Sequence, residues 1–309
     1  MDFAGKRGWF FLLSLLVILP GLVFLAIAPG LKPGIDFTGG STLTLEFADP
    51  VDQPDLRAEL ATLGQPDATV QKLGKDIFFI RTKELDSPTK DALLQGLETA
   101  LSPNGVDELS FELVSAVVAG ETVVNAFYAV LAAAVGIFIY VWWAFRNLPS
   151  PVRYGAAAIV ALLHDALIVI GIFAILGVLA DIEVGTMFLI AILTVIGYSV
   201  NDTIVVFDRI RENVLTYPNR ELAQVVNLSI SESLGRSLNT SLTLLFTLMA
   251  LMLFGGQTIR EFLLVLLIGV VVGTYSSIGI ASQLLVSWEH GDLRRVLRRM
   301  RTSRTSAPA

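Results

Sequence analysis

Two charged residues lie in or beside long apolar segments of the chain, where a charge is unfavourable. Asp202 belongs to the apolar run that starts at Val184, and Arg236 directly precedes another apolar run. A charged side chain near the centre of a bilayer costs about 2.5–3.5 kcal/mol on insertion scales, so each residue needs a partner or a function. Burial favours the neutral form of an acid, whereas a nearby guanidinium favours the carboxylate. We therefore expect Asp202 and Arg236 to act as a proton relay whose pairing weakens when the acid is protonated.

Polar side chains accompany both charges at helical spacing. In a helix, spacings of three or four residues place such side chains on one face. We expect the two polar faces to meet across a hydrated seam. The alternative is that Asp202 and Arg236 snorkel and pair as a purely structural clamp. The supporting polar residues predicted from the spacing are Tyr198, Ser199, Asn201, Thr203, Asn239, Thr240 and Thr243.

His164 and Asp165 form a second polar pair inside an apolar segment. We treat this pair as a secondary site, because its groups can also be satisfied by local hydrogen bonds or by Ser and Thr on a neighbouring helix. An intramembrane aspartyl protease would use Asp165 and Asp202 as two carboxyls that share one proton. Arg236 would instead favour ionisation of Asp202, and Asn201 replaces the glycine that precedes the aspartate in the familiar protease motif.

Motifs of other chemistries are missing from the sequence. It has no Gly-Lys-Ser/Thr phosphate-binding motif, no histidine-rich metal site and no Ser-His-Asp constellation. We therefore expect no metal, no cofactor and no ATPase or hydrolase activity. An ion gradient, carried by H⁺ or Na⁺, is the expected energy source.

The composition is that of a membrane protein. Of 309 residues, 54% are apolar and 16% are charged, none is cysteine, and the mean hydropathy is +0.69. These values exclude a disordered chain and a disulfide-stapled secreted domain. A bilayer about 30 Å thick needs about 20 apolar residues per helix. Six segments meet that length: Trp9 to Ala28, Thr122 to Phe145, Tyr154 to Ala180, Val184 to Phe207, Leu238 to Phe254 and Ile259 to Trp288.

The distribution of cations predicts the orientation. Lys and Arg collect on the cytoplasmic side of membrane proteins, and here they precede the first span, follow the second and fourth spans, and fill the tail after the sixth. We therefore expect both termini to be cytoplasmic and residues 30–119 to be periplasmic. The alternative is a cleaved signal peptide ending near Ala28, although the apolar run is longer than such peptides require. The net charge of −6 would argue against nucleic acid if it were evenly spread, but the tail from Arg294 to Arg304 is strongly basic. We expect no nucleic-acid partner.

The chain divides into four expected regions. Residues 1–29 hold the cytoplasmic N-terminus and first span, and 30–119 form the periplasmic domain. Residues 120–290 hold spans two to six, with an amphipathic cytoplasmic helix near 221–235. Residues 291–309 form a basic cytoplasmic tail.

The periplasmic segment reads as one small α+β domain. Alternating apolar residues predict strands at 41–47, 69–73, 77–81 and 109–117. Helical patterns cover 55–63 and 87–101, the second with Ser87 as its cap. The order β-α-β-β-α-β is the ferredoxin-like pattern. The sequence thus predicts six transmembrane helices and a ferredoxin-like periplasmic domain.

Three motifs closely resemble the SecD/SecF family of bacterial protein-export membrane proteins, specifically its SecF branch, in the resistance-nodulation-division superfamily. They are Gly34-Ile35-Asp36-Phe37-Thr38-Gly39-Gly40, the run from Gly197-Tyr198-Ser199-Val200-Asn201-Asp202-Thr203 to Glu212, and Arg236-Ser237-Leu238-Asn239-Thr240-Ser241. The likeness covers almost the whole chain.

This resemblance implies a subunit of the SecDF complex in the bacterial inner membrane. It implies SecD as a heterodimer partner, the SecYEG channel, the SecA motor, YajC or YidC as further partners, and a translocating preprotein as cargo. Proton flow would drive periplasmic domain movements, with Asp202 and Arg236 matching the family's functional charges on this subunit. The alternative within the superfamily is a proton-coupled exporter of small molecules.

Overall fold

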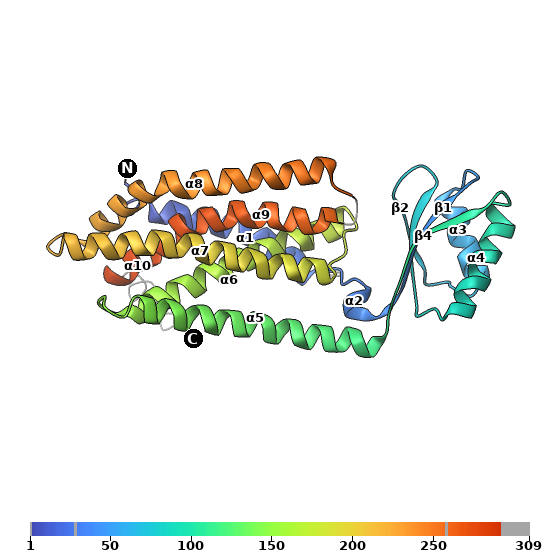
Figure 1. Cartoon of the computed structure of the whole chain (residues 1–309), viewed down its shortest axis with the longest axis horizontal. Helices are drawn as coiled ribbons and strands as arrows, with labels where there is room; N and C mark the ends of the chain where they lie inside the picture. The colour runs from blue at the N-terminus through green and yellow to red at the C-terminus, as the bar shows by residue number, and fades with distance from the viewer. Residues whose placement is uncertain (1, 28–29, 257–258, 292–309) are drawn as a thin grey trace, which may run out of the picture. The chain divides into compact units, whose positions relative to one another are not determined.

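The computed structural model describes residues 2–27, 30–256 and 259–291, so the basic tail expected at 291–309 lies, beyond its first residue, outside the described residues. The chain forms two compact units: residues 33–128, and residues 1–32 with 129–309. Within the described residues, six helical segments are long and apolar enough to cross a membrane. They are α1 (Arg7–Ala26), α5 (Ala116–Ala144), α6 (Pro151–Leu179), α7 (Thr186–Thr216), α8 (Leu222–Phe254) and the stretch Arg260–Glu289 (Figure 1). The prediction of six spans is confirmed.

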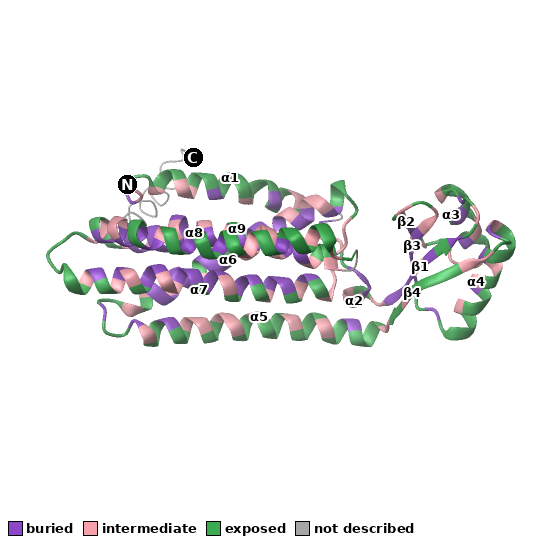
Figure 2. Ribbon diagram, turned by 45° about the horizontal axis from the view of Figure 1, so that its top comes forward, coloured by how far each residue is buried: buried purple, intermediate pink, exposed green. Residues whose placement is uncertain are grey.

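The centre of the helical unit is made by α6, α7 and the last span. In the most apolar 18-residue stretch of α6, and likewise of α7, half of the residues are buried. In the corresponding stretch of α5 none is buried (Figure 2). Large apolar side chains such as Phe127 and Trp143 on α5 are therefore exposed in the isolated chain. This pattern is that of helices whose outer faces meet lipid or another subunit.

Glycine allows the closest helix contacts. A Cβ added at Gly269 of α9 (Arg260–Ser276) would lie on the side chain of Val195, and one at Gly273 would lie 3.0 Å from Ser199 Cβ. Gly21 and Gly171 are in backbone contact, which joins α1 to α6. Small residues spaced by four let membrane helices approach in this way.

Two helices differ from the expected boundaries. The amphipathic segment near 221–235 is not a separate helix but the first half of α8, because neither proline nor a turn signal interrupts 222–254. The sixth span changes geometry within the membrane unit: α9 continues into a π-helical turn, η2 (Ser277–Ala281), and then into α10 (Ser282–Glu289). Single π-helical turns frequently accompany functional sites.

The unit of residues 33–128 has the predicted order of elements. These are β1 (Gly40–Phe47), α3 (Gln53–Thr62), β2 (Thr69–Lys72), β3 (Ile77–Thr82), α4 (Ser87–Leu101) and β4 (Val106–Val114), preceded by the short helix α2 (Ile35–Thr38). The antiparallel sheet has the order β2-β3-β1-β4, as in ferredoxin-like domains. Leu43 and Leu45 of β1 are fully buried with Phe78 and Ile80 of β3.

Two local details of this domain were predicted wrongly. Asp86, not Ser87, caps α4, and its carboxylate accepts a hydrogen bond from the Thr89 amide at 3.1 Å. A carboxylate suits that position because it also faces the positive end of the helix dipole. The last strand covers Val106–Val114 rather than 109–117, and it cannot extend to residue 117 because α5 already starts at Ala116.

Candidate functional site

Asp202 lies on α7 with only 7% of its surface exposed. Its buried Oδ2 atom and the buried hydroxyl of Ser237 on α8 make no hydrogen bond of good geometry among the described residues, although the hydroxyls of Ser237 and Ser277 lie near the carboxyl group. Buried polar atoms are almost always paired, so unpaired ones in a native structure need an explanation. Both residues line a cavity of about 230 Å³, together with Tyr198, Asn201, Val205, Arg236 and Thr240. A polar cavity of that size is large enough to hold water beside the acid.

Arg236 lines the same cavity from α8 and is exposed. The direct ion pair expected between Arg236 and Asp202 is not formed here: across the described parts of the chain, no nitrogen–oxygen distance of 4 Å or less joins them. The two charges therefore share a polar cavity rather than a salt bridge. In such a cavity the acid can bind or lose a proton without first breaking a closed pair.

Hydrogen bonds between hydroxyl groups join the helices around the cavity. The Tyr198 hydroxyl of α7 lies 2.8 Å from Ser241 of α8, and Ser241 lies 2.6 Å from Thr274 of α9. Thr203, next to Asp202, lies 3.0 Å from Ser277 in the π-helical turn. The seam between α7 and α8 thus extends to the last span.

The polar residues predicted around Asp202 and Arg236 have different surroundings. Tyr198, Asn201 and Thr240 line the cavity, whereas Ser199 is buried on another side of α7. Asn239 and Thr243 are exposed on α8, so the expected facing of whole polar stripes is wrong for these two. The Thr243 hydroxyl donates to the Asn239 carbonyl within its own helix.

The buried contact face of α8 is a serine row that the sequence analysis missed. Its members lie four residues apart and are all buried: Ser229, Ser233, Ser237 and Ser241. That strict spacing was the available signal, because residues four apart share one helix face.

His164 and Asp165 form a hydrogen-bonded cluster in the core of the helical unit. Asp165 is fully buried; its Oδ1 lies 2.8 Å from His164 Nδ1, and its Oδ2 accepts from Ser199 at 2.5 Å and Ser276 at 2.7 Å. Asp202 Oδ2 takes no part in this cluster. A protease dyad needs two carboxyls in hydrogen-bond contact, and the described contacts do not place Asp165 and Asp202 in that arrangement.

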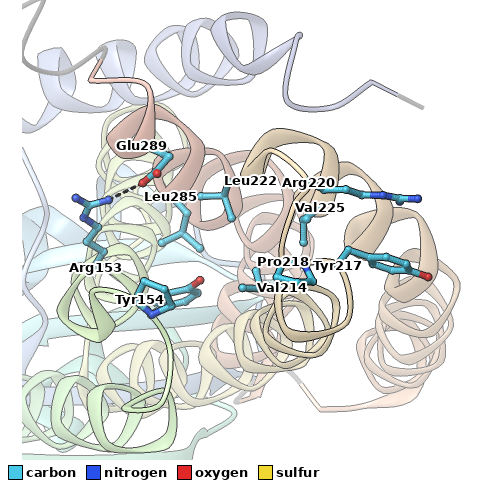
Figure 3. A pocket seen from close by; sticks show the side chains of 11 residues that line it. Arg153, Tyr154, Val214, Tyr217, Pro218, Arg220, Leu222, Val225, Leu285 and Glu289 are labelled. Atoms are coloured by element: carbon cyan, nitrogen blue, oxygen red, sulfur yellow. Dashed lines mark hydrogen bonds and ion pairs between the residues drawn. The ribbon is translucent and has the colours of Figure 1, made fainter.

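A second cavity, of about 190 Å³, lies among α6, α7, α8 and α10 (Figure 3). Its Arg153 is already paired with Glu289 at 2.9 Å. The Arg220 guanidinium lies over the Tyr217 ring, and both side chains extend away from the apolar residues Leu222 and Leu285 (Figure 3). This cavity does not include the predicted relay residues.

The glycine motif after α1 has a clear structural role. Gly34 precedes α2, and Gly39 and Gly40 have φ values of +74° and +126°, which L side chains rarely adopt. Arg81 of β3 holds the turn, because its guanidinium donates to the Pro33 carbonyl at 3.1 Å and to the Thr38 hydroxyl at 2.6 Å. Asp36 and Phe37 of the motif are half-buried.

Replacing Gly40 with Ala should destabilise the domain. A Cβ there would lie 2.7 Å from the Thr82 carbonyl oxygen, in addition to the strain of the positive φ. Gly105→Ala is the matched control, because Gly105 has φ +129° but no atom within 4 Å of the added Cβ. We expect Gly40→Ala to lower the free energy of unfolding by about 1–3 kcal/mol more than the control. Hydrogen exchange of β1 and β3 amides in the full chain measures the difference, and equal exchange in both variants would contradict this account.

Comparison with known proteins agrees with these features. Residues 97–291 match the family model described as protein export membrane protein SecD/SecF, C-terminal, and residues 24–51 match the SecD/SecF GG motif. The chain is 46% identical over 311 residues to the protein translocase subunit SecF of Thermobaculum terrenum and 41% identical over 302 residues to that of Anaerolinea thermophila. Each match covers 97% of both chains.

Solved structures show the same likeness. The crystal structure of SecDF from Thermus thermophilus, described as a translocon-associated membrane protein, superposes with a TM-score of 0.82 at 34% identity. That match covers 94% of this chain and 39% of the SecDF chain, so this chain spans well under half of that relative. A second structure, of SecDF in a super-membrane-facing form, gives a TM-score of 0.63 at 30% identity. With a family model over most of its length and relatives similar from end to end, the chain belongs to the SecD/SecF family of protein-export membrane proteins.

Proposed function

We propose that this chain is the SecF-type subunit that couples an ion gradient, in the first place the proton motive force, to preprotein movement across the bacterial inner membrane. The observation that carries the proposal is the buried carboxyl group of Asp202, which lines a polar cavity together with Arg236. Protonation removes the charge of this buried acid, and deprotonation restores its attraction to the guanidinium. An acid that alternates between these states supplies a two-state element that a gradient can bias.

SecD is the proposed heterodimer partner. In the isolated chain, α7 and α8 expose polar groups within their membrane-spanning lengths, including Asn201, Arg236 and Asn239. Polar and charged groups in contact with lipid are unfavourable, so a protein surface that covers them is expected. A partner carboxylate at this face would complete the relay, and the likeness to SecDF chains more than twice as long supports SecD as its source.

The remaining partners follow from the family. We propose that the complex acts beside the SecYEG channel after the SecA-driven step, with YajC or YidC associated, and that the domain of residues 33–128 contacts the emerging preprotein on the periplasmic side. Both termini are proposed to be cytoplasmic, because Lys and Arg concentrate in the segments that share their side.

Reconstitution tests the coupling directly. Vesicles containing SecYEG, SecD and this chain, supplied with SecA and ATP, should export more preprotein with a proton gradient than without it. A protonophore should remove the stimulation, whereas a sodium ionophore should not. Stimulation that survives the protonophore but not the sodium ionophore would assign Na⁺ instead, and stimulation that survives both would contradict ion coupling. Gradient-driven release of small molecules without preprotein export would favour the exporter alternative.

A further inference from the structure

A chain of four hydrogen bonds joins α1 to α6 and α9. The Tyr275 hydroxyl donates to the Phe10 carbonyl at 2.7 Å, and Ser14 lies 3.1 Å from the Tyr275 hydroxyl. His164 Nε2 lies 2.9 Å from Ser14 Oγ, and His164 Nδ1 lies 2.8 Å from Asp165 Oδ1. Ser14, His164 and Asp165 are all buried, so these groups depend on one another for hydrogen bonds.

The protons available to this chain can be counted. A carbonyl oxygen only accepts, so the single hydroxyl proton of Tyr275 is used on Phe10. Ser14 must then donate its own proton to Tyr275. With no proton left on Ser14, the contact with His164 is a hydrogen bond only if Nε2 carries a proton and donates it.

The count continues on the other side of the imidazole. When Nε2 is protonated, Nδ1 and the Asp165 oxygen form a hydrogen bond only if a further proton lies between them. That proton sits either on Nδ1, as an imidazolium–carboxylate pair, or on Oδ1, as a carboxylic acid beside a neutral imidazole. The pair has no net charge in either case, which suits its burial.

We propose that His164 and Asp165 form a second proton-binding site, separate from Asp202. The proton bound at His164 and Asp165 stabilises the hydrogen bonds between α1 and its neighbours α6 and α9. If the proton passes to solvent water, His164 keeps one ring proton. If that proton is on Nδ1, Ser14 must donate its own proton to Nε2 and can no longer donate to Tyr275. If it is on Nε2, then Nδ1 and the Asp165 carboxylate are both acceptors and form no hydrogen bond with each other. One hydrogen bond of the chain is lost either way. The carboxylate favours a proton on Nδ1, because the hydrogen bond between them is then charge-assisted, so the bond lost is the one between Ser14 of α1 and Tyr275 of α9.

The surroundings keep the site apart from the cavity of Asp202. The groups that the described contacts bring to the pair are Ser14 of α1, Ser199 of α7, and Tyr275 and Ser276 of α9; of these only Tyr275 is itself ionisable. Asp202 lies on α7 one turn beyond Ser199 and lines the cavity that it shares with Arg236. The inference depends on these bonds and not on the proposed export function.

Binding of the proton at His164 and Asp165 affects how α1 is held to α6 and α9. After α1 the chain continues into the glycine motif and the domain of residues 33–128. Gain or loss of one proton would therefore change how firmly the helix that leads into that domain is held to the bundle.

Nitrogen-15 NMR of the histidine rings gives the first test. The chain has two histidines, and His290→Gln leaves His164 as its sole imidazole; His290 itself only contacts the Val286 carbonyl at 3.0 Å. In the full chain in lipid bilayers at neutral pH, we expect a protonated Nε2, with the second proton on or shared with Nδ1. An unprotonated Nε2 would overturn the proposal, because Ser14 would then be its donor.

Two substitutions give the second test. Asp165→Asn imitates the protonated pair, because its amide can donate to Nδ1 while its carbonyl accepts from Ser199 and Ser276. Ser14→Ala instead removes the bonds that this side chain of α1 makes to His164 and Tyr275. We expect hydrogen exchange of the α1 amides in Asp165→Asn to match the parent chain, and exchange in Ser14→Ala to be about tenfold faster, as expected for lost hydrogen bonds between α1 and its neighbours. Loosening of α1 in Asp165→Asn, or unchanged exchange in Ser14→Ala, would contradict the proposal.

Discussion

Replacing Asp202 with Asn should reduce gradient-dependent export to the level measured without a gradient. The amide has nearly the shape of the acid but cannot lose a proton at any working pH. Because Asp202 lines a polar cavity and its neighbours Ser237 and Ser277 carry hydroxyl groups, which can donate or accept, the amide should cause little strain there. The seam between α7 and α8 should keep its Tyr198 to Ser241 contact. The expected defect is therefore in coupling and not in folding.

The measurement is export into vesicles that contain SecYEG, SecD and the variant, with and without a proton gradient. Asp208→Asn is the matched control: Asp208 lies on the same helix but is exposed and paired with Arg211 at 2.6 Å. Copurification with SecD should be unchanged in both variants. Full stimulation in Asp202→Asn, or equal loss in Asp208→Asn, would rule out the role proposed for this acid.

The sequence alone identified Asp202 as a candidate because one physical quantity, the cost of a charge in an apolar segment, marks it without any knowledge of its neighbours. The ferredoxin-like order was also predictable, since each strand and helix leaves a local pattern and the pairing follows from their order. The glycines of the motif after α1 were recognised but not explained. Their reason, the approach of Gly40 to the Thr82 carbonyl, joins residues far apart in the sequence.

The parts that were missed are those that depend on contacts between distant segments. Ser14 and His164 are hydrogen-bonded across 150 positions, and nothing near Ser14 in the sequence indicates a partner. The serine row of α8 was visible as a spacing, but serine is common in membrane helices and its spacing does not say which helix it meets. The exposure of Arg236 and Asn239 is likewise a property of the assembled helices, because a stripe of polar residues has the same sequence whether it faces a neighbouring helix or a missing subunit.

Arg236 should be required for its positive charge at the Asp202 cavity. Arg236→Gln should lose nearly all gradient-dependent stimulation, because the deprotonated acid then has no cation in its cavity to attract it. Arg236→Lys keeps the charge but not the planar donor group, so we expect partial activity. Arg211→Gln is the control, since it removes a cation that is paired with Asp208 and does not line the cavity.

A double-mutant cycle shows whether the two charges act on each other. Asp202→Glu and Arg236→Lys each keep their charge and should leave measurable stimulation. If Asp202 and Arg236 form one switch, the loss in the double variant should differ from the product of the single losses by about tenfold in stimulated rate, which corresponds to a coupling of about 1.4 kcal/mol. Charges that merely clamp separate helix ends would give independent effects on the rate, with losses that multiply. The cycle, measured in the complex with SecD, therefore separates a relay between α7 and α8 from a structural role of each residue.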